Sequence, residues 1–273
     1  MNRATYANRG VTVVVTTLAL CFALFFVLPF AGLVNRAIED GNTWDLWRTQ
    51  QARDALVLSL WTSTLTVALA VVFGTPVAYM LARWRFPGKS IIDALVDLPI
   101  VLPPTVAGVA LLTAFGRRGL IGQPLEEWTG LTFGFTTTAV VMAQLLVSAP
   151  FYVRAAKSGF ESVNPDMERV AFTLGASRVR TFFRILLPQT WPAILAGIIL
   201  AWSRAMGELG ATLIFAGNFQ GKTQTMPLAI ISAFEGSSLG LAGAIALSLV
   251  LLAVAMAVLV VFRVVAGRAA ANL

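Results

Sequence analysis

Long runs of apolar residues, separated by short polar segments, dominate the hydrophobic pattern of this chain. A helix needs about 20 mainly apolar residues to cross the roughly 30 Å hydrocarbon core of a bilayer, because each residue adds about 1.5 Å of rise. Six segments meet this requirement and predict an all-α, polytopic membrane protein with six transmembrane helices. They are Val11–Val34, Ala55–Ala82, Ala94–Phe115, Leu131–Val153, Trp191–Gly217 and Leu239–Phe262.

Prolines interrupt several of these predicted spans. Pro76, Pro103, Pro104 and Pro150 each lack a backbone donor and clash with the preceding turn, so we expect kinks at these positions. Kinked spans suit a pathway that opens and closes. Transmembrane helices also tolerate proline widely, however, so the kinks alone do not indicate transport.

Composition and charge agree with a membrane protein. Of the 273 residues, 58% are hydrophobic and 12% are charged, which is far from the composition of soluble domains. The formal charge of +7 could indicate nucleic-acid binding, but in so apolar a chain it fits basic cytoplasmic loops better, and we expect no nucleic-acid partner. Histidine is absent and Cys21 is the only cysteine, so we expect neither a metal site nor an enzyme active site.

The distribution of Lys and Arg predicts the orientation of the chain, because basic residues near membrane ends favour the cytoplasmic side. The N-terminus, the second and fourth loops and the C-terminal tail carry 13 basic residues, against six on the other side. Both termini are therefore expected in the cytoplasm. Arg3 and Arg9 precede the first segment, but its uncharged run is longer than the ~7 to 15 apolar residues of a signal peptide, so we expect a retained helix.

The fourth loop, from Arg154 to Gln189, is long for a connection between neighbouring helices and should hold structure of its own. Asn164, Pro165 and the acidic residues after them predict a helix start, and Gly175 predicts the end of this short helix near Leu174. Residues 178–185 continue as a basic, amphipathic stretch. From this pattern alone, the loop could be an interfacial helix held by anionic lipid.

The same loop resembles the cytoplasmic signature of permeases of binding-protein-dependent ABC importers. The resemblance is carried by Glu168-Arg-Val-Ala-Phe-Thr-Leu-Gly175, followed after nine residues by Ile185-Leu-Leu-Pro188. It implies a coupling helix that docks into a groove on a separate ATPase subunit. Arg169 and Val170 depart from the small residues often found there. The residues that fall on the motif are Glu168, Ala171, Gly175, Ile185, Leu187 and Pro188.

Two further stretches, Asp97–Gly108 and Trp202–Leu228, look like the molybdate and tungstate permeases within this family, and sulfate permeases share parts of both. The resemblance implies a type I ABC importer permease-like fold, one permease domain over residues 1–273 and a coupling loop at about 154–189. It also implies a bacterial or archaeal inner-membrane location, a second permease copy, two ATPases and an extracytoplasmic oxyanion-binding protein. ATP would be used by the partner subunit, with no cofactor in this chain.

Charged residues within the predicted fifth span indicate a candidate translocation path. Arg204 and Glu208 are four residues apart and can pair on one helix face. A charge at mid-membrane costs roughly 2.5 to 3.5 kcal/mol on insertion scales, so the pair should either neutralise itself in the protein interior or line a polar path. Together with Thr212 and Asn218, these residues form the predicted path.

Other polar features favour no separate activity. The stretch from Gly217 to Thr223 falls one residue short of a phosphate-binding P-loop, and no ATP site is expected there. Asp97 and Glu235 lie near predicted segment ends and are expected to have structural or loop roles. An ion-coupled secondary transporter remains an alternative class of function, which the coupling-loop signature disfavours.

Overall fold

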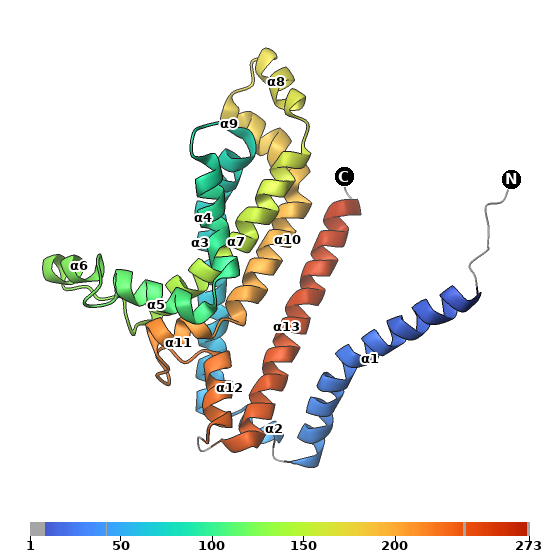
Figure 1. The fold of residues 1–273 in the computed structure, drawn as a ribbon, viewed down its shortest axis with the longest axis vertical. Helices are drawn as coiled ribbons and strands as arrows, with labels where there is room; N and C mark the ends of the chain where they lie inside the picture. Colours follow the sequence, from blue (N-terminus) through green and yellow to red (C-terminus); the bar gives the residue numbers. More distant parts are fainter. Residues whose placement is uncertain (1–8, 42, 237–238, 272–273) are drawn as a thin grey trace.

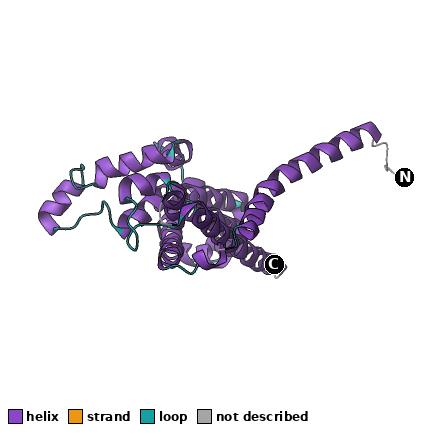
Figure 2. Ribbon diagram, turned by 90° about the horizontal axis from the view of Figure 1, so that it is seen from below, coloured by secondary structure: helices purple, strands orange, loops and turns teal. Residues whose placement is uncertain are grey.

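The computed structural model describes residues 9–41, 43–236 and 239–271, and within these ranges it contains helices and loops but no strands (Figure 2). The all-α prediction is confirmed. The elements in chain order are α1 (Arg9–Glu39), α2 (Thr43–Leu46), α3 (Gln50–Arg83), α4 (Lys89–Val101), α5 (Pro104–Phe115), α6 (Gly122–Thr129), α7 (Thr137–Ser162), α8 (Pro165–Thr173), α9 (Arg178–Thr181), the π-helix η1 (Phe182–Leu186), α10 (Leu187–Met206), α11 (Gly210–Ala216), α12 (Met226–Phe234) and α13 (Gly240–Ala271).

A bundle of α3, α7 and α10 forms the centre of the molecule (Figure 1). Leu81 of α3 and Tyr152 and Phe160 of α7 are fully buried between these helices. They pack with Ile194 and Met206 of α10 in one continuous apolar cluster. This rigid core positions the shorter helices that carry the candidate functional residues.

Five helical segments in the described residues are long and apolar enough to cross a membrane, and the pair α4–α5 makes a sixth if it is counted as one bent span. The prediction of six spans therefore holds, but the third is broken, and the chain bends by 118° between its two helices. Pro76 and Pro150, where kinks were also expected, lie inside the continuous helices α3 and α7.

The break between α4 and α5 follows from two consecutive prolines. A residue before proline is disfavoured in helical conformation. Leu102 precedes Pro103, which in turn precedes Pro104, and both Leu102 (ψ 139°) and Pro103 (ψ 136°) are extended. Pro104 then occupies the first turn of α5, where its missing N–H costs no hydrogen bond.

The predicted fifth span, Trp191–Gly217, is wrong as a single helix, because it divides into α10 and α11. The chain leaves helical geometry at Gly207 and resumes it at Gly210. The predicted fourth span is also shifted: α7 begins at Thr137 and continues to Ser162, so the first two turns of the predicted coupling loop belong to α7.

Two parts of the chain leave the central bundle on opposite sides, and Figures 1 and 2 agree on this arrangement. One is α1, whose most hydrophobic stretch buries no residue within the chain. The other is the pair α5 and α6. The apolar side chains that α1 and α5 leave uncovered are compatible with contact to lipid or to further subunits.

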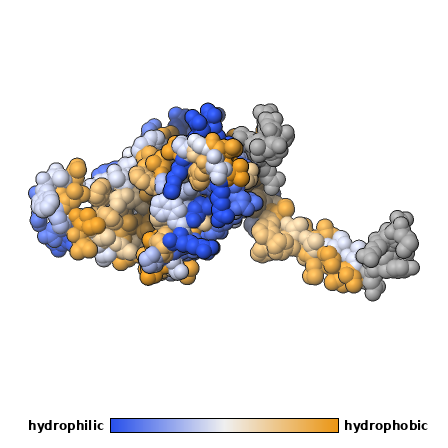
Figure 3. All heavy atoms as spheres, turned by 90° about the horizontal axis from the view of Figure 1, so that it is seen from above, coloured by the Kyte–Doolittle hydropathy of each residue, from blue (hydrophilic) through white to orange (hydrophobic). Residues whose placement is uncertain are grey.

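The end of the bundle that carries α8 and α9, here called the α8 end, also holds the last turn of α3 and the start of α4 (Figure 1). Seen from this side, hydrophilic residues gather over the centre of the molecule, and apolar residues surround them (Figure 3). The basic residues of the second and fourth loops thus share one end of the bundle, as the charge count requires.

Candidate functional site

Local sequence explains why α8 forms where it does. The side chain of Asn164 accepts a hydrogen bond from the N–H of Asp166 (2.9 Å) and so caps the helix start. Pro165 follows in the first turn, and Asp166 and Glu168 place negative charge where the helix dipole favours it. The predicted helix start is confirmed at Asn164.

Gly175 ends α8 as predicted. Its backbone is left-handed (φ +83°), a conformation that strains most other residues. Its N–H bonds to the carbonyl of Phe172, and the N–H of Ala176 bonds to the carbonyl of Ala171, each at 3.0 Å. These two bonds form a Schellman motif, which satisfies carbonyls at the helix end and turns the chain sharply.

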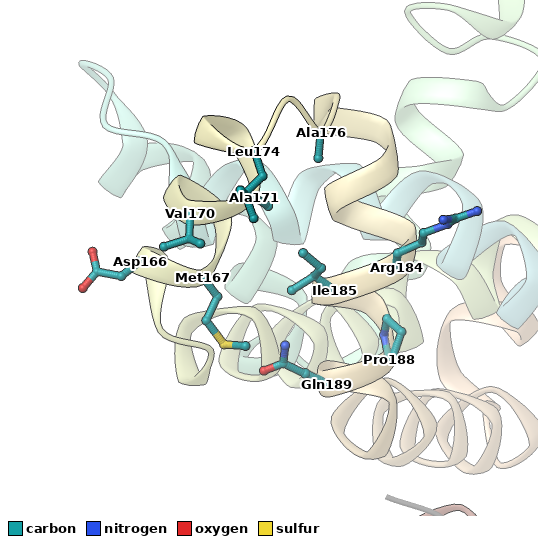
Figure 4. A pocket seen from close by; sticks show the side chains of 10 residues that line it. All are labelled: Asp166, Met167, Val170, Ala171, Leu174, Ala176, Arg184, Ile185, Pro188 and Gln189. Carbon is teal, nitrogen blue, oxygen red and sulfur yellow. The ribbon is translucent and has the colours of Figure 1, made fainter.

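The side of α8 that faces the start of α10 borders a hollow of about 700 Å³, here called the coupling hollow (Figure 4). Of the predicted motif residues, Ala171, Ile185 and Pro188 line it. The remaining lining is mostly apolar and comprises Met167, Val170, Leu174 and Ala176, with Asp166, Arg184 and Gln189.

Three apolar side chains that line the coupling hollow are exposed although they lie on a short polar loop: Met167 (44%), Val170 (57%) and Leu174 (83%). Exposed apolar groups clustered on one element are typical of a surface that contacts another protein. The sequence motif did not single out these three residues, although their spacing of three and four residues places them on one helix face.

Glu168 does not line the coupling hollow. Its carboxylate instead pairs with Arg83 at the end of α3 (Nε to Oε1, 2.8 Å), and both side chains are only 11% exposed. Arg83 also donates to the carbonyl of Val163 (3.0 Å), and the hydroxyl of Tyr79 makes a long hydrogen bond to Glu168 (3.4 Å). This group fastens α8 and the α7–α8 connection to α3. From the sequence, Arg83 was recognised only as a basic residue of the second loop, so its pairing with Glu168 was not predicted.

Leu187 and Gly175 are not among the residues that line the hollow, although Leu174 and Ala176 on either side of Gly175 are. Leu187 begins α10 and faces a different groove, between α3 and α10. The structure therefore separates the motif into residues that line the hollow, a buried anchor at Glu168 and a turn at Gly175.

Two more ion pairs join α4 to α7 near the α8 end. Asp97 pairs with Arg154 (2.7 Å), and Asp93 pairs with Lys157 (2.7 Å). Asp97 thus has a partner that fits the structural role expected for it. Glu235 lies exposed just after α12.

Arg204 and Glu208 form the predicted ion pair (Nη1 to Oε2, 2.7 Å). Glu208 is almost completely buried (1% exposed), and its other oxygen accepts the N–H of Ala211 (2.8 Å), so it caps the first turn of α11. Arg204 is 29% exposed in the last turn of α10. The pair therefore bridges the break between two helices instead of lying along one.

The other two predicted path residues are held inside the chain. Thr212 is fully buried in α11. Asn218 donates to Ser232 (2.7 Å) and accepts from Gln224 (2.9 Å), which in turn accepts from Gln51 of α3. The four predicted path residues thus lie at the α10–α11 break, inside α11 and in the loop that follows it.

The two stretches that resemble molybdate and tungstate permeases pack against each other. α5 lies on α11, and a Cβ on Gly108 would come within 2.9 Å of the Cα of Ala211. Only glycine allows this approach. The two breaks, between α4 and α5 and between α10 and α11, are thus joined by close backbone packing.

Comparison with known proteins agrees with this architecture. A family model described as binding-protein-dependent transport system inner membrane component matches residues 70–270. The molybdenum transport system permease protein ModB of Escherichia coli (strain K12) is 43% identical over 202 residues, covering 74% of this chain and 88% of that protein. The sulfate transport system permease protein CysT of Salmonella typhimurium (strain LT2) is 34% identical over 239 residues, covering 87% of this chain and 86% of that protein.

A solved structure shares the fold. It is a bacterial alginate ABC transporter in complex with an alginate pentasaccharide-bound periplasmic protein, which matches with a TM-score of 0.72 and 18% identity over 93% of this chain and 91% of that one. The family match covers most of the chain, and the helices match this known transporter fold. This multi-pass membrane protein therefore belongs to the family of inner membrane components of binding-protein-dependent transport systems.

Proposed function

We propose that the chain is the permease subunit of an ATP-driven importer that carries a tetrahedral oxyanion, molybdate or tungstate, into the cytoplasm. The observation that carries this proposal is the 43% identity to a molybdenum permease, which extends over 202 residues. Sulfate is the second candidate, because a sulfate permease is 34% identical over a longer stretch of the chain. The higher identity favours molybdate or tungstate.

The geometry of α8 supports a coupling role. Met167, Val170 and Leu174 present exposed apolar side chains on a short helix whose two ends are capped. A helix that is capped at both ends moves as a rigid unit. A rigid unit with two discrete positions can transmit the movement of one subunit to another. We propose that an ATPase subunit receives this helix. ATP is then used in that partner, and this chain needs no cofactor.

The link between α8 and the membrane is the Arg83–Glu168 pair. The pair is buried, so pulling its partners apart would leave a charge without water or counter-ion. Movement of α8 is therefore transmitted to the end of α3. In this account, Glu168 positions the coupling helix from the inside, and the apolar residues outside contact the ATPase.

For the translocation path, we propose that Arg204 meets the anion in passing. Its side chain remains partly exposed, and Glu208 neutralises part of its charge. Conduction requires binding that is weak enough to release the ion. Thr212 and Asn218 would then support the wall of the path through packing and hydrogen bonds within the chain.

The assembly that we propose has two permease copies, two ATPases on the α8 end and an oxyanion-binding protein at the opposite end. The α8 end would face the cytoplasm, in agreement with the distribution of basic residues. A periplasmic binding protein accompanies the alginate transporter that shares the fold, which supports the kind of partner.

Site-specific photo-crosslinking tests the coupling role. A photoreactive amino acid at Leu174, the most exposed of the three apolar residues, should capture the ATPase when the subunits are expressed together. The same probe at Trp128 of α6, which is equally exposed (85%) but lies away from the α8 end, is the matched control. Equal capture from both positions, or capture from neither in an assembled complex, would contradict the proposal.

A further inference from the structure

A second groove, here called the membrane groove, lies between α3 and α10 and has a volume of about 710 Å³. Val72 and Thr75 of α3 and Ile198 of α10 line its walls, and Tyr152 of α7 lies at its base. At the α8 end it is bounded by α9 and η1. It is distinct from the coupling hollow, with which it shares no lining residue.

The length of the membrane groove matches one leaflet. Along α3 it extends from Val71 to Trp84, a distance of about 20 Å at the rise of an α-helix. Half of a hydrocarbon core is about 15 Å thick. The groove therefore runs from near mid-membrane to the interface at the α8 end.

The polarity of the groove changes along its length in the same way as the polarity of a lipid molecule changes from acyl chain to headgroup. Its deep part is apolar, and the hydroxyls of Thr75 and Tyr152 bond to each other there, so neither needs water. At the α8 end, Trp84 is partly exposed, as aromatic residues at a membrane interface are. An acyl chain fits the deep part and a headgroup fits the rim.

The rim of the groove is cationic. Arg178 lines it, and neither Arg178 nor its neighbours Arg180 and Arg184 forms an ion pair with any residue that the structure describes. These arginines belong to the basic, amphipathic stretch that follows α8; Arg184 lines the coupling hollow, whereas Arg178 and Arg180 do not. Unpaired arginines at a membrane interface attract anionic headgroups.

We propose that the membrane groove binds one anionic glycerophospholipid, with an acyl chain along α3 and its phosphate at Arg178. The lipid holds α9 and η1 against α3, next to the coupling helix. The proposal does not depend on which oxyanion is carried.

Native mass spectrometry of the detergent-purified, delipidated complex tests this site. Phosphatidylglycerol and phosphatidylcholine with the same acyl chains are titrated separately. The wild-type complex should bind phosphatidylglycerol roughly fivefold more tightly, which is the gain in affinity expected from one arginine at the membrane interface. Arg178→Gln should abolish this preference, whereas Arg180→Gln, on the same short helix but outside the groove, should keep it. Equal preferences in the two variants would overturn the proposal.

A second variant tests the acyl-chain part of the groove. Val72 is 64% exposed, so Val72→Trp should fill the groove without disturbing the core, and binding of both lipids should fall at least roughly fivefold because acyl-chain burial is lost. Unchanged binding would show that the lipids sit elsewhere and would overturn the assignment.

A rival occupant is helix α1 of a second permease copy. Cys21, the only cysteine, is exposed on α1 and reports on this possibility. Val72→Cys in the groove and Phe73→Cys, an equally exposed neighbour outside it, should form disulfide-linked dimers to the same low extent in oxidised membranes. Strong cross-linking at Val72→Cys alone would place a protein helix in the groove and overturn the lipid proposal.

Discussion

Glu168 illustrates how a motif residue can act from inside the chain. Its carboxylate is buried against Arg83, and removing one partner of a buried ion pair typically costs about 3 to 5 kcal/mol. We predict that Glu168→Lys remains inserted in the membrane but loses most ATP-coupled uptake, because two buried cations would detach α8 from α3. Uptake and ATPase stimulation in reconstituted vesicles measure this effect.

Charge reversal provides the decisive comparison. The double variant Arg83→Glu with Glu168→Arg should recover a substantial part of uptake, because the pair is restored with opposite sense. Arg85→Glu with Glu168→Arg is the matched control, since Arg85 is exposed and unpaired in the described residues, and it should not recover. Recovery in both doubles, or in neither, would argue against the anchor.

Arg204 and Glu208 allow a similar separation of structural and functional roles. Each single change to Gln leaves a charge without its partner and should reduce assembly. Changing both to Gln removes both charges together, and the amide oxygen introduced by Glu208→Gln can still accept the Ala211 N–H. If Arg204 serves passage of the anion, this double variant should assemble with its ATPase yet import several-fold more slowly.

The readouts for this pair are complex yield after affinity purification and initial uptake rate. Wild-type uptake by a well-assembled double variant would show that the pair only stabilises the helix break. The spacing of four residues predicted the ion pair correctly. It did not show that the helix ends between the two residues, where Gly207 closes α10 and Glu208 caps the first turn of α11.

At the scale of elements, α8 was the most predictable part of the molecule. Its start and end are both set by nearby residues: Asn164 and Pro165 at one end and Gly175 at the other. Local hydrogen bonds decide such boundaries, so a sequence pattern suffices. The partner of Glu168 was not predictable in the same way, since Arg83 lies 85 positions earlier in the chain.

Gly175 tests the element directly. A Cβ at this position would meet no atom within 4 Å, so the cost of substitution comes from the left-handed backbone alone. We predict that Gly175→Val uncouples ATP hydrolysis from uptake, whereas Gly175→Asn retains most coupling, because asparagine tolerates this conformation. The measurement is uptake per ATP hydrolysed in reconstituted vesicles. Similar coupling in the two variants would contradict a role for the turn.

The broken spans show the limit of hydropathy. Pro103 and Pro104 predicted a kink, and the chain bends by 118° there. No proline marks the break after α10, where Glu208 and the packing of Gly108 on α11 decide the geometry. An apolar run measures transfer into lipid, and it does not distinguish one straight helix from two short ones.

At the scale of the whole molecule, the sequence predicted the class of protein and the number of spans but not their arrangement. The divergence of α1 from the bundle and the extension of α5 and α6 away from it depend on what surrounds the chain (Figure 1). Both features fit a subunit whose remaining contacts are made by lipid and by other subunits of a transporter.

Transport by the complete assembly is the direct test of ATP-driven oxyanion import. The permease is reconstituted in proteoliposomes with its ATPase and binding protein, and uptake of molybdate is followed with ATP supplied on the α8 side. We predict uptake that requires ATP hydrolysis, is inhibited by tungstate and is little affected by sulfate at the same concentration. Uptake that proceeds without ATP in an ion gradient, or that prefers sulfate, would contradict it.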